Sequence, residues 1–577
     1  MPLAPEAPPD RFTAAGAAGA ALWLVFCVAW FDAGAAWRPA ALAALPRLAL
    51  LVPVAVAAAV WLHGRRPTLG GEPLTSADRR TLLFLLALAF FFRLPVVLAG
   101  AGVAVTADGA LSGIVALHAR DGLERLVFVP QVPYSGSLKS HITAPLALGL
   151  DPAVAFALVS VLFYLAYVAG LYRLARLVAS RRAAVLAGLY AAFSPAFVTR
   201  YSLSNDGNYV EVLALSAWAL WLAARWPGEV AARPRLAFAA GLLLGLGFWC
   251  HILAVIPLAA VAAFLVLAAR LGSARSLVAL AGGWAVGYVP GWLWNAANGW
   301  QSFEYLLPGQ ARAGETGIEA VTSGLGEKLR LMVTDHWPVL MGYDTGYGPL
   351  VDGLLLASAW LGVAAALGAA AWTAARAWRE RSWPLFLMIL FAATNLAIAL
   401  VALPHVPGNP RYILFVMCVV PVMLCDALAT GWRRGVLFVL VATGAVASFA
   451  QVPGTLRGDA RWRQFVAAME SEGVRWCYTD FYLATRVNFL SGERIVCSAK
   501  LGPTTTEYFF SYREQVEKAP EAAYIAVNRT SATRLGNRLT QLGVGYERLE
   551  LMKPVLTRLT RKVDPEELFP GREFPMR

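Results

Sequence analysis

The sequence predicts a polytopic all-α membrane protein that carries a small α/β domain at its C-terminal end. Of 577 residues, 58% are hydrophobic and only 15% are charged, with a mean hydropathy of +0.58, which is too apolar for a soluble protein of this size. Apolar runs of about 17 to 25 residues recur along most of the chain, and each is long enough to cross roughly 30 Å of hydrocarbon. Beyond Gln451 the charged residues rise to about a quarter of the segment, the usual level of a soluble domain. Soluble enzymes, secreted disulfide scaffolds and disordered chains are thereby excluded.

The apolar runs predict about thirteen transmembrane helices. The first run lacks the basic leader of a signal peptide, because Glu6 and Asp10 precede Arg11, so we expect it to be retained. The expected spans are 14–32, 40–62, 81–100, 152–172, 183–200, 208–225, 236–250, 252–269, 277–297, 351–374, 384–402, 412–428 and 435–452.

Arginines mark every second loop between these spans. Because short cytoplasmic loops of membrane proteins are enriched in Arg and Lys, this set of loops is predicted to be cytoplasmic. The N-terminus is then inside and the C-terminal segment outside, and the net charge of +13 needs no nucleic acid to explain it. We expect a multi-pass protein of the cytoplasmic (inner) membrane. Representative arginines of the set are Arg65, Arg79, Arg173, Arg181, Arg225, Arg235, Arg275, Arg376, Arg381 and Arg433.

Three regions follow from this pattern. Residues 1–79 form a transmembrane hairpin with a cytoplasmic loop, 80–452 form a transmembrane core with large external loops at 101–151 and 298–348, and 453–577 form a soluble extracytoplasmic domain. In the last region, helical and strand patterns alternate, which predicts a small α/β layer fold. The helices are expected at 460–472, 482–490, 512–518 and 531–542, and the strands at 474–479, 494–499, 523–528 and after 545.

Two cysteines of the external domain, Cys477 and Cys497, lie on successive predicted strands. A disulfide is expected if the compartment is oxidising, and two buried thiols are an equally good interpretation. The sequence contains no CxxC pair, no Walker motif and no GxGxxG between a strand and a helix, so zinc ribbons and nucleotide hydrolysis lack support.

The first external loop opens with Thr106-Ala107-Asp108. A carboxylate just beyond the end of a membrane helix lies at the border of a low dielectric and can act as a base or a metal ligand. Asp108 is therefore the first candidate for a catalytic residue. The alternative is that Asp108 is the N-cap of a helical, amphipathic segment at 111–126, which is the more common role for such a residue taken alone.

A second acidic site follows at the next external turn. Asp206 lies in an Asn-Asp-Gly sequence that is typical of an ordinary turn. Glu211, however, lies about one turn into a membrane span, where an ionisable group is costly and usually functional or paired. We expect Asp206 and Glu211 to meet Asp108 at one site.

Basic groups on the outer side are few. Lys139 and Arg411 are candidates to hold a phosphate through charge-assisted hydrogen bonds, whereas Arg93, just below the outer boundary, is expected to pair with an acid or to snorkel. His141 is the histidine best placed beside Asp108. Since no HxxxH or HxH spacing occurs, a divalent metal is only weakly supported, and no coenzyme is evident.

Several short motifs together resemble the GT-C superfamily of integral membrane glycosyltransferases, near the protein O-mannosyltransferase (glycosyltransferase family 39) and aminoarabinose transferase branches. The resemblance covers about residues 80–452 and departs from the family at Gly109, where an acidic residue is common, and at 140–145, where Lys-Pro-Pro or His-Pro-Pro is common. The motifs that carry it are Arg93-Leu94, Thr106-Ala107-Asp108, His141–Pro145, Asn205-Asp206 and Arg411-Tyr412.

This resemblance implies transfer of a hexosyl or pentosyl group from a polyprenyl-phosphate donor to a lipid, glycan or protein acceptor on the outer face of the membrane. Asp108 would be the general base, and Asp206 and Glu211 would orient the acceptor or support a metal. The reaction would invert the anomeric carbon. The alternative function is a transporter or flippase for a lipid-linked saccharide, although no clear internal repeat supports it. The residues expected to bind the substrate are Lys139, His141, Arg411, Tyr412 and Arg93.

Overall fold

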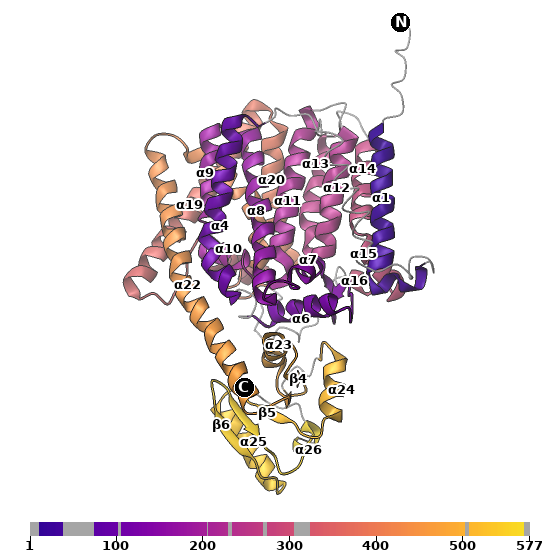
Figure 1. Ribbon diagram of the computed structural model, residues 1–577. Helices are drawn as coiled ribbons and strands as arrows, with labels where there is room; N and C mark the ends of the chain where they lie inside the picture. The colour runs from indigo at the N-terminus through magenta and orange to yellow at the C-terminus, as the bar shows by residue number, and fades with distance from the viewer. Residues whose placement is uncertain are drawn as a thin grey trace.

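The computed structural model describes residues 11–38, 74–101, 106–204, 206–228, 233–268, 274–304, 324–501 and 507–569. The molecule is mostly helical, with a bundle of roughly parallel helices at one end and a smaller α/β domain at the other (Figure 1). The bundle helices are α1 (Arg11–Trp30), α4 (Ser76–Ala99), α8 (Pro152–Val178), α9 (Arg181–Ala192), α10 (Ala196–Tyr201), α11 (Tyr209–Arg225), α12 (Arg233–Cys250), α13 (Val255–Ala268), α14 (Ala274–Gly287), α15 (Val289–Ala297), α19 (Pro349–Glu380), α20 (Trp383–Ala402), α21 (Val420–Leu428) and α22 (Arg434–Ser471).

Each expected span within the described residues coincides with a helix or with a broken pair of helices, while the run at 40–62 lies outside them. Among the described residues, five helices are long and apolar enough to cross a membrane, or up to seven if each of two bent pairs counts as one span. The difference from about thirteen arises because several helices are short, such as α11 with 17 residues and α13 with 14, and because other runs are interrupted. For example, the run at 183–200 ends its first helix at Ala192 and resumes at Ala196. The chain is a multi-pass membrane protein, and the full count stays a prediction.

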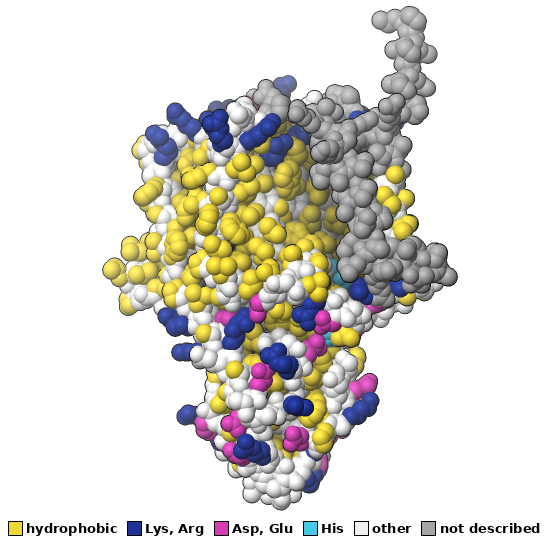
Figure 2. Space-filling view, viewed as in Figure 1, with side chains coloured by type: hydrophobic (Ala, Val, Ile, Leu, Met, Phe, Trp, Pro, Cys, Tyr) yellow, Lys and Arg dark blue, Asp and Glu magenta, His cyan; other side chains and the backbone are white. Residues whose placement is uncertain are grey.

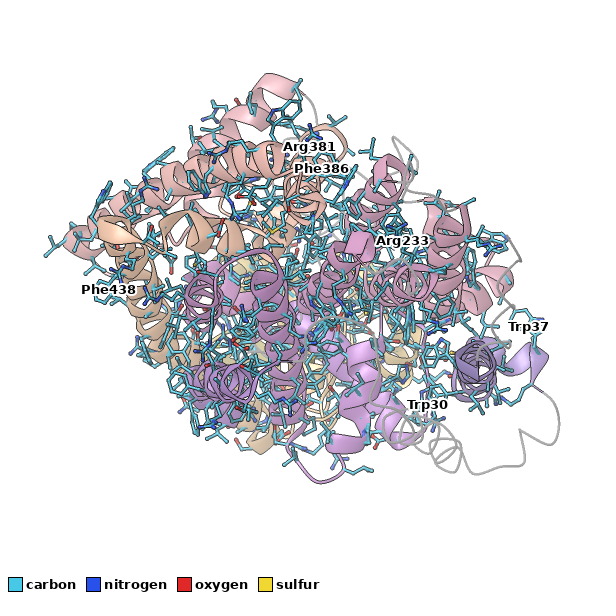
Figure 3. All side chains as sticks on the ribbon, turned by 90° about the horizontal axis from the view of Figure 1, so that it is seen from above. Trp30, Trp37, Arg233, Arg381, Phe386 and Phe438 are labelled. Carbon is cyan, nitrogen blue, oxygen red and sulfur yellow. A yellow bond between two sulfur atoms is a disulfide. The ribbon has the colours of Figure 1, made fainter. Side chains whose placement is uncertain are left out.

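Side-chain types divide the surface into zones (Figure 2). A broad hydrophobic belt covers the bundle, Lys and Arg gather along the edge farthest from the α/β domain, and charges of both signs cover that domain. Seen from the arginine-rich end, Trp30 and Trp37 lie on one side of the bundle and Phe438 on the opposite side (Figure 3). This distribution agrees with the positive-inside pattern, although the orientation itself stays a prediction.

At the other end of the bundle, four short elements lie across the ends of the long helices. They are α6 (Ala107–Asp121), the hairpin strands β1 (Phe128–Val129) and β2 (Val132–Gly136), and α7 (Leu138–Leu146). The helix expected at 111–126 begins earlier, at Ala107, and its N-cap is Thr106, whose hydroxyl accepts a hydrogen bond from the N–H of Gly109 at 3.0 Å. The N-cap interpretation of Asp108 is therefore wrong, because Asp108 lies in the first turn.

Helix α6 is enclosed and is not an amphipathic surface helix. Its residues from Gly109 to Ala119 are all buried, because α7 and α8 cover one side and the C-terminal domain covers the other (Figure 1). Gly113 allows the closest approach, since a Cβ atom there would come within 2.4 Å of the Phe489 ring.

The long helix α22 connects the bundle to the C-terminal domain. The composition boundary at 453 predicted a new domain there, but α22 continues through Pro453 to Ser471 without a break. Beyond it lie the helices α23 (Phe481–Leu490), α24 (Phe510–Lys518), α25 (Arg529–Gln541) and α26 (Pro565–Leu568), and the strands β3 (Trp476–Tyr478), β4 (Val496–Ser498), β5 (Ala523–Ile525), β6 (Glu547–Glu550) and β7 (Pro554–Thr557).

These strands form one sheet of order β4-β3-β5-β7-β6, in which β4, β3 and β5 are parallel and β7 and β6 are antiparallel. The order of helices and strands is the one that the alternating pattern predicts. Cys477 and Cys497 are register partners on β3 and β4 and form a disulfide, so of the two interpretations of these cysteines the structure has the bridge.

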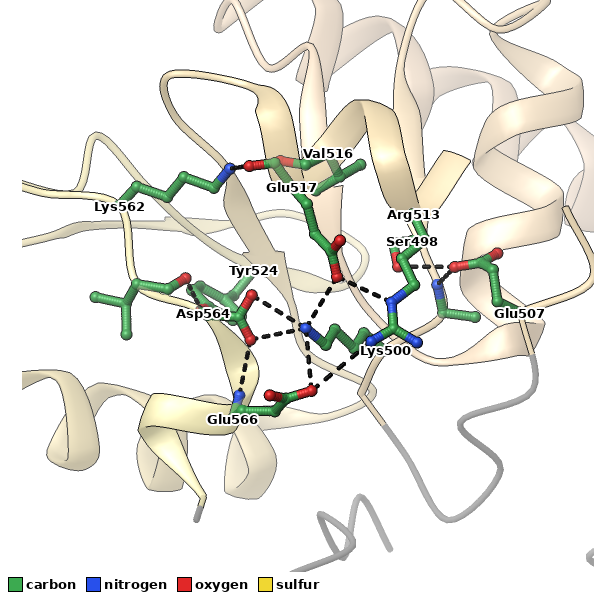
Figure 4. Close-up of polar contacts among 12 residues, drawn as sticks. Ser498, Lys500, Glu507, Arg513, Val516, Glu517, Tyr524, Lys562, Asp564 and Glu566 are labelled. Carbon is green, nitrogen blue, oxygen red and sulfur yellow. Dashed lines mark hydrogen bonds and ion pairs between the residues drawn. The ribbon is translucent and has the colours of Figure 1, made fainter. Parts of the chain in front are cut away.

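An ionic cluster joins the last part of the chain to the sheet (Figure 4). The ammonium group of Lys500, which follows β4, lies 2.9 Å from Asp564, 3.1 Å from Glu517 and 3.3 Å from Glu566. Arg513 on α24 shares Glu517 with it at 2.9 Å. One lysine therefore holds α24, the segment before α26 and α26 itself on the end of β4.

Candidate functional site

A buried ion pair lies where α7 meets α11. The Nζ atom of Lys139 lies 3.1 Å from Oε1 of Glu211, and only 1% of each side chain is exposed. Lys139 comes from the first turn of α7 and Glu211 from the first turn of α11. Nζ also lies 5.3 Å from the centroid of the Phe156 ring on α8. Since both charges are removed from water, each depends on the other, and the two candidates from separate sequence motifs form one unit.

Asn208 aligns the two halves of this pair. Its side-chain amide donates hydrogen bonds to Ser135 Oγ at 3.0 Å, to the carbonyl of Gly136 and to the carbonyl of Cys250 at 3.0 Å. It thereby ties the strand that precedes Lys139 to the turn that precedes Glu211. The backbone of Asn208 is left-handed, with φ 56° and ψ 28°, a conformation that Asn tolerates better than most residues.

Sequence reasoning missed Asn208 because an Asn beside Asp-Gly is typical of any turn. The available signal was weak: a second Asn directly before a span whose first turn carries an acid.

Arg411 lies in an aromatic setting at the start of the 3₁₀ helix η9 (Arg411–Cys418). Its Nη2 donates to the hydroxyl of Tyr412 at 3.0 Å, and η9 packs against α11, which begins at Tyr209. Tyr209 in turn stands edge-on to Tyr201 with ring centroids 5.3 Å apart, and lies 5.2 Å from His251. The ring centroid of Tyr209 lies 6.0 Å from that of Phe415 on η9, and Tyr209 shares the first turn of α11 with Glu211, so η9 meets the helix start that carries the ion pair.

The remaining acids lie on elements that are in contact with α7 or α6. Asp108 is exposed in the first turn of α6, and α6 is joined to α7 by a hydrogen bond from Ser140 Oγ to the carbonyl of Ser112 at 2.9 Å. Asp206 opens the short 3₁₀ turn η3 (Asp206–Asn208), which contacts α6, and its side chain lies outside the described part of the structure. The structure thus places Asp108, with its side chain exposed, on a helix that contacts the helix of Lys139.

His141 is held by the protein through both ring nitrogens. The indole N–H of Trp30 donates to Nδ1 at 3.1 Å, and Nε2 donates to the carbonyl of Leu126 at 2.8 Å. Burial lowers the pKa of His141 to about 4, so the ring is neutral at pH 7. In this geometry His141 fixes α7 against α1 and the hairpin.

Arg93 is fully buried between helices of the bundle. It donates to the hydroxyls of Ser202 and Ser194 and to the carbonyls of Ala89 and Ala192. Its guanidinium carbon lies 4.0 Å from the centroid of the Tyr164 ring. Arg93 therefore neither pairs with an acid nor snorkels to the interface. Its guanidinium contacts neutral oxygen atoms and an aromatic ring, and these contacts join α4 to α8, α9 and the segment around α10.

Two comparisons with known proteins bear on this arrangement. A family model described as dolichyl-phosphate-mannose-protein mannosyltransferase matches residues 141–294, well under half of the chain, and the match includes Glu211. The fold matches the crystal structure of ArnT from Cupriavidus metallidurans bound to undecaprenyl phosphate, with a TM-score of 0.54 and 14% identity. That match covers 85% of this chain and 100% of the other. The chain has the GT-C fold.

The apo state of the same ArnT also has the GT-C fold in common with this chain, with a TM-score of 0.53 and 14% identity over 83% of this chain and 98% of the other. The resemblance expected from the short motifs is therefore confirmed. No curated protein sequence matches the chain significantly.

Within this GT-C fold, the chemistry available at the site is that of carboxylates, cations and phenols. No group of three or more His, Cys, Asp or Glu side chains is arranged to hold a metal ion among the described residues. The cations Lys139 and Arg411 are suited to an anionic leaving group, and an exposed carboxylate is suited to accept a proton from a hydroxyl.

Proposed function

We propose that this chain is a membrane glycosyltransferase that moves a sugar from a polyprenyl-phosphate donor to an acceptor on the outer face of the cytoplasmic membrane. The observation that carries the proposal is the buried Lys139–Glu211 pair, held at the same end of a GT-C bundle as Arg411. Charges are costly at such depth, and they are usually retained where a substrate needs them.

In the proposed reaction, Asp108 accepts the proton of the acceptor hydroxyl as its oxygen attacks the anomeric carbon. The bond between that carbon and the phosphate oxygen breaks, and the electron pair leaves with the polyprenyl phosphate. Arg411 and Lys139 stabilise the departing charge, while Tyr412 orients the guanidinium of Arg411. A single displacement of this kind inverts the anomeric carbon.

Glu211 has a different task from Asp108 in this scheme. It is buried against Lys139, so it keeps the ammonium group charged and in place when the active site is closed to water. Asp206, at the start of the turn that leads to Glu211, is proposed to orient the acceptor.

The donor class is supported by the matched structures. One of the ArnT crystal structures contains undecaprenyl phosphate, and the matching family model is described by a dolichyl-phosphate sugar donor. Both lipids are polyprenyl phosphates, and the acceptor proposed here is an envelope lipid, glycan or protein. An extracytoplasmic position of the C-terminal domain is supported by its disulfide, since such bonds persist in oxidising compartments.

The test uses cells that lack the gene, complemented at matched expression with wild type, Asp108→Asn or Asp121→Asn. Asp121 is the control because it lies at the opposite end of α6 and pairs with Arg120. Mass spectrometry of envelope glycans and of polyprenyl-phosphate sugars should show that wild type and Asp121→Asn restore a sugar on one acceptor. Asp108→Asn should leave the donor unspent.

If Asp108→Asn restores the sugar on the acceptor as well as wild type does, Asp108 is not the general base. Transport of a lipid-linked saccharide by the purified protein in liposomes, with no glycosyl transfer, would favour the flippase instead.

A further inference from the structure

A groove lies far from the ion pair, on the arginine-rich side of the bundle between α19, α21 and α22. Its volume is about 260 Å³. The lining is almost wholly apolar and consists of Ala365, Gly368, Ala369, Trp372, Ala427, Leu428, Trp432, Arg433 and Val436.

The floor of the groove is built from small residues of α19. The short side chains of Ala365, Gly368 and Ala369 leave a depression in the surface of α19. A Cβ atom placed on Gly368 would have no other atom within 4 Å. Leu428 and Val436 form the walls. A channel of this kind within the hydrophobic belt fits an unbranched hydrocarbon chain.

The mouth of the groove has the composition of a membrane interface. Trp432 belongs to the 3₁₀ turn η10 (Gly431–Arg433) and is 82% exposed, and Trp372 lies across from it on α19. Exposed tryptophans at this level are typical of side chains that lie among lipid headgroups.

Charge at the mouth is positive. Arg376 is compensated, because it pairs with Glu380 and Asp426. Arg433 and Arg434, in contrast, form no ion pair with any carboxylate of the described residues, and both are exposed. An apolar groove that is lined at its mouth by Arg433, with Arg434 as the next residue of the chain, is complementary to a molecule with a hydrocarbon tail and an anionic head.

We propose that this groove binds an anionic glycerophospholipid, with one acyl chain between α19 and α21 and the headgroup phosphate on Arg433 and Arg434. Basic pockets between membrane helices at this face are known to select anionic lipids. The site is separate from the proposed transferase centre and does not depend on it.

The test is native mass spectrometry of the purified full chain in detergent, titrated with phosphatidylglycerol or with phosphatidylcholine of the same acyl chains. Wild type should bind phosphatidylglycerol about tenfold more tightly than phosphatidylcholine, since each arginine near a phosphate strengthens binding severalfold. Gly368→Leu fills the floor and should abolish the tight binding event.

The matched control is Gly353→Leu, on the same helix, where a new Cβ atom also meets nothing within 4 Å. It should bind like wild type. The double change Arg433→Gln and Arg434→Gln should make the two lipids bind equally, and it tests the headgroup contact even if Gly368→Leu fails to fold.

Three results would overturn the assignment. Equal binding of both lipids by wild type would mean unselective annular lipid only. Unchanged binding by Gly368→Leu would place the lipid elsewhere. Displacement of phosphatidylglycerol by a tenfold lower concentration of polyprenyl phosphate would make the polyprenyl lipid the occupant.

Discussion

At the scale of single residues, the site depends on partners that lie far apart in the chain. Lys139 was expected to hold a phosphate, and Glu211 to orient an acceptor or support a metal. The structure pairs these two residues with each other, and their position on the outer side stays a prediction. Their pairing could not be predicted, because the depth at which α7 starts is set by the hairpin and by Asn208. Alternation of charge and hydropathy carries no information on that depth.

Removal of one partner of the pair should be more harmful than removal of both. Glu211→Gln leaves the Lys139 ammonium buried without a counter-charge and should cost about 3 to 5 kcal/mol of unfolding free energy. The double change Lys139→Met and Glu211→Gln should recover most of that loss while activity stays absent. Unfolding of the purified variants in detergent, followed beside sugar transfer, measures both. Additive losses in the double variant would contradict the coupling.

Asn208 should act through position. Asn208→Gly keeps the left-handed backbone accessible but removes three hydrogen bonds, so we expect kcat to fall by about tenfold or more with KM changed little. Asn208→Ala should be worse, because Ala also strains the backbone at φ 56°.

Steady-state kinetics of both Asn208 variants separate the two effects. A wild-type kcat for Asn208→Gly would show that the amide does not position the Lys139–Glu211 pair.

At the scale of elements, α6 links the two parts of the molecule. On its inner side it contacts α7 and α8, and on its outer side Phe489 of α23 packs on Gly113. The imidazole of His118 lies 2.8 Å from Glu493, whose carboxylate also accepts a hydrogen bond from the hydroxyl of Tyr512 at 2.6 Å. The C-terminal domain is therefore attached to the same helix that carries Asp108.

The pH dependence of this attachment follows from His118. Burial of the ring opposes the charge, but Glu124 and Glu493 outweigh it and raise the pKa of His118 to about 9, compared with 6.5 in the unfolded chain. A raised pKa means that the stabilisation is fully present below pH 6.5 and is lost as the pH rises through about 9. The difference in thermal stability between wild type and His118→Gln should shrink over this window. A constant difference from pH 6 to about pH 10 would exclude a charged His118.

The ionic cluster of the C-terminal domain allows a second test at this scale. Lys500→Met leaves Glu517, Asp564 and Glu566 together without their central cation and should destabilise the domain by about 1 to 3 kcal/mol. Lys518→Met is the control, because that side chain is 78% exposed and pairs with Glu514 at the surface. Urea unfolding followed by tryptophan fluorescence compares them. Equal effects would mean that the cluster contributes no more than a surface pair.

Helices and strands were predicted well where each has its own hydrophobic periodicity and a residue that ends it. The helices and strands after 473 follow the predicted order, because each is short and several are separated by Gly, Pro or Asn, as at Gly473, Pro520, Asn528 and Gly543. The span expected at 435–452 and the helix expected at 460–472 are parts of one continuous helix, α22. The start of α6 was placed four residues late, because neighbouring elements supply burial and contacts that the local sequence does not show.

At the scale of the whole molecule, the Cys477–Cys497 disulfide is a covalent bond whose persistence depends on an oxidising compartment. It joins cysteines 20 residues apart and should stabilise the C-terminal domain by about 3 kcal/mol. Paired replacement by Ser should lower the unfolding midpoint of that domain and leave the bundle unchanged. Peptide mapping without reductant checks the bond directly, and two alkylatable thiols at Cys477 and Cys497 would contradict it.

The overall class could be predicted because hydropathy and charge act over long stretches of chain, where single contacts matter little. The enclosure of α6 between the bundle and the sheet could not be predicted, because it depends on where α22 delivers the C-terminal domain. The residues that make this contact, Gly113 and Phe489, have no common feature in the sequence.

The length of helix α22 sets both the distance of the C-terminal domain from the bundle and its rotation about the helix axis. Its 38 residues form a rod of about 57 Å that begins at the arginine-rich face and ends inside the C-terminal domain. In a rod, one inserted residue raises everything beyond it by only about 1.5 Å but turns it by about 100°. The rotation therefore constrains the number of residues in α22 between the membrane and the domain. Insertion of one residue would rotate α23 away from α6. Insertion of seven residues would nearly restore the orientation of α23, but farther from the bundle.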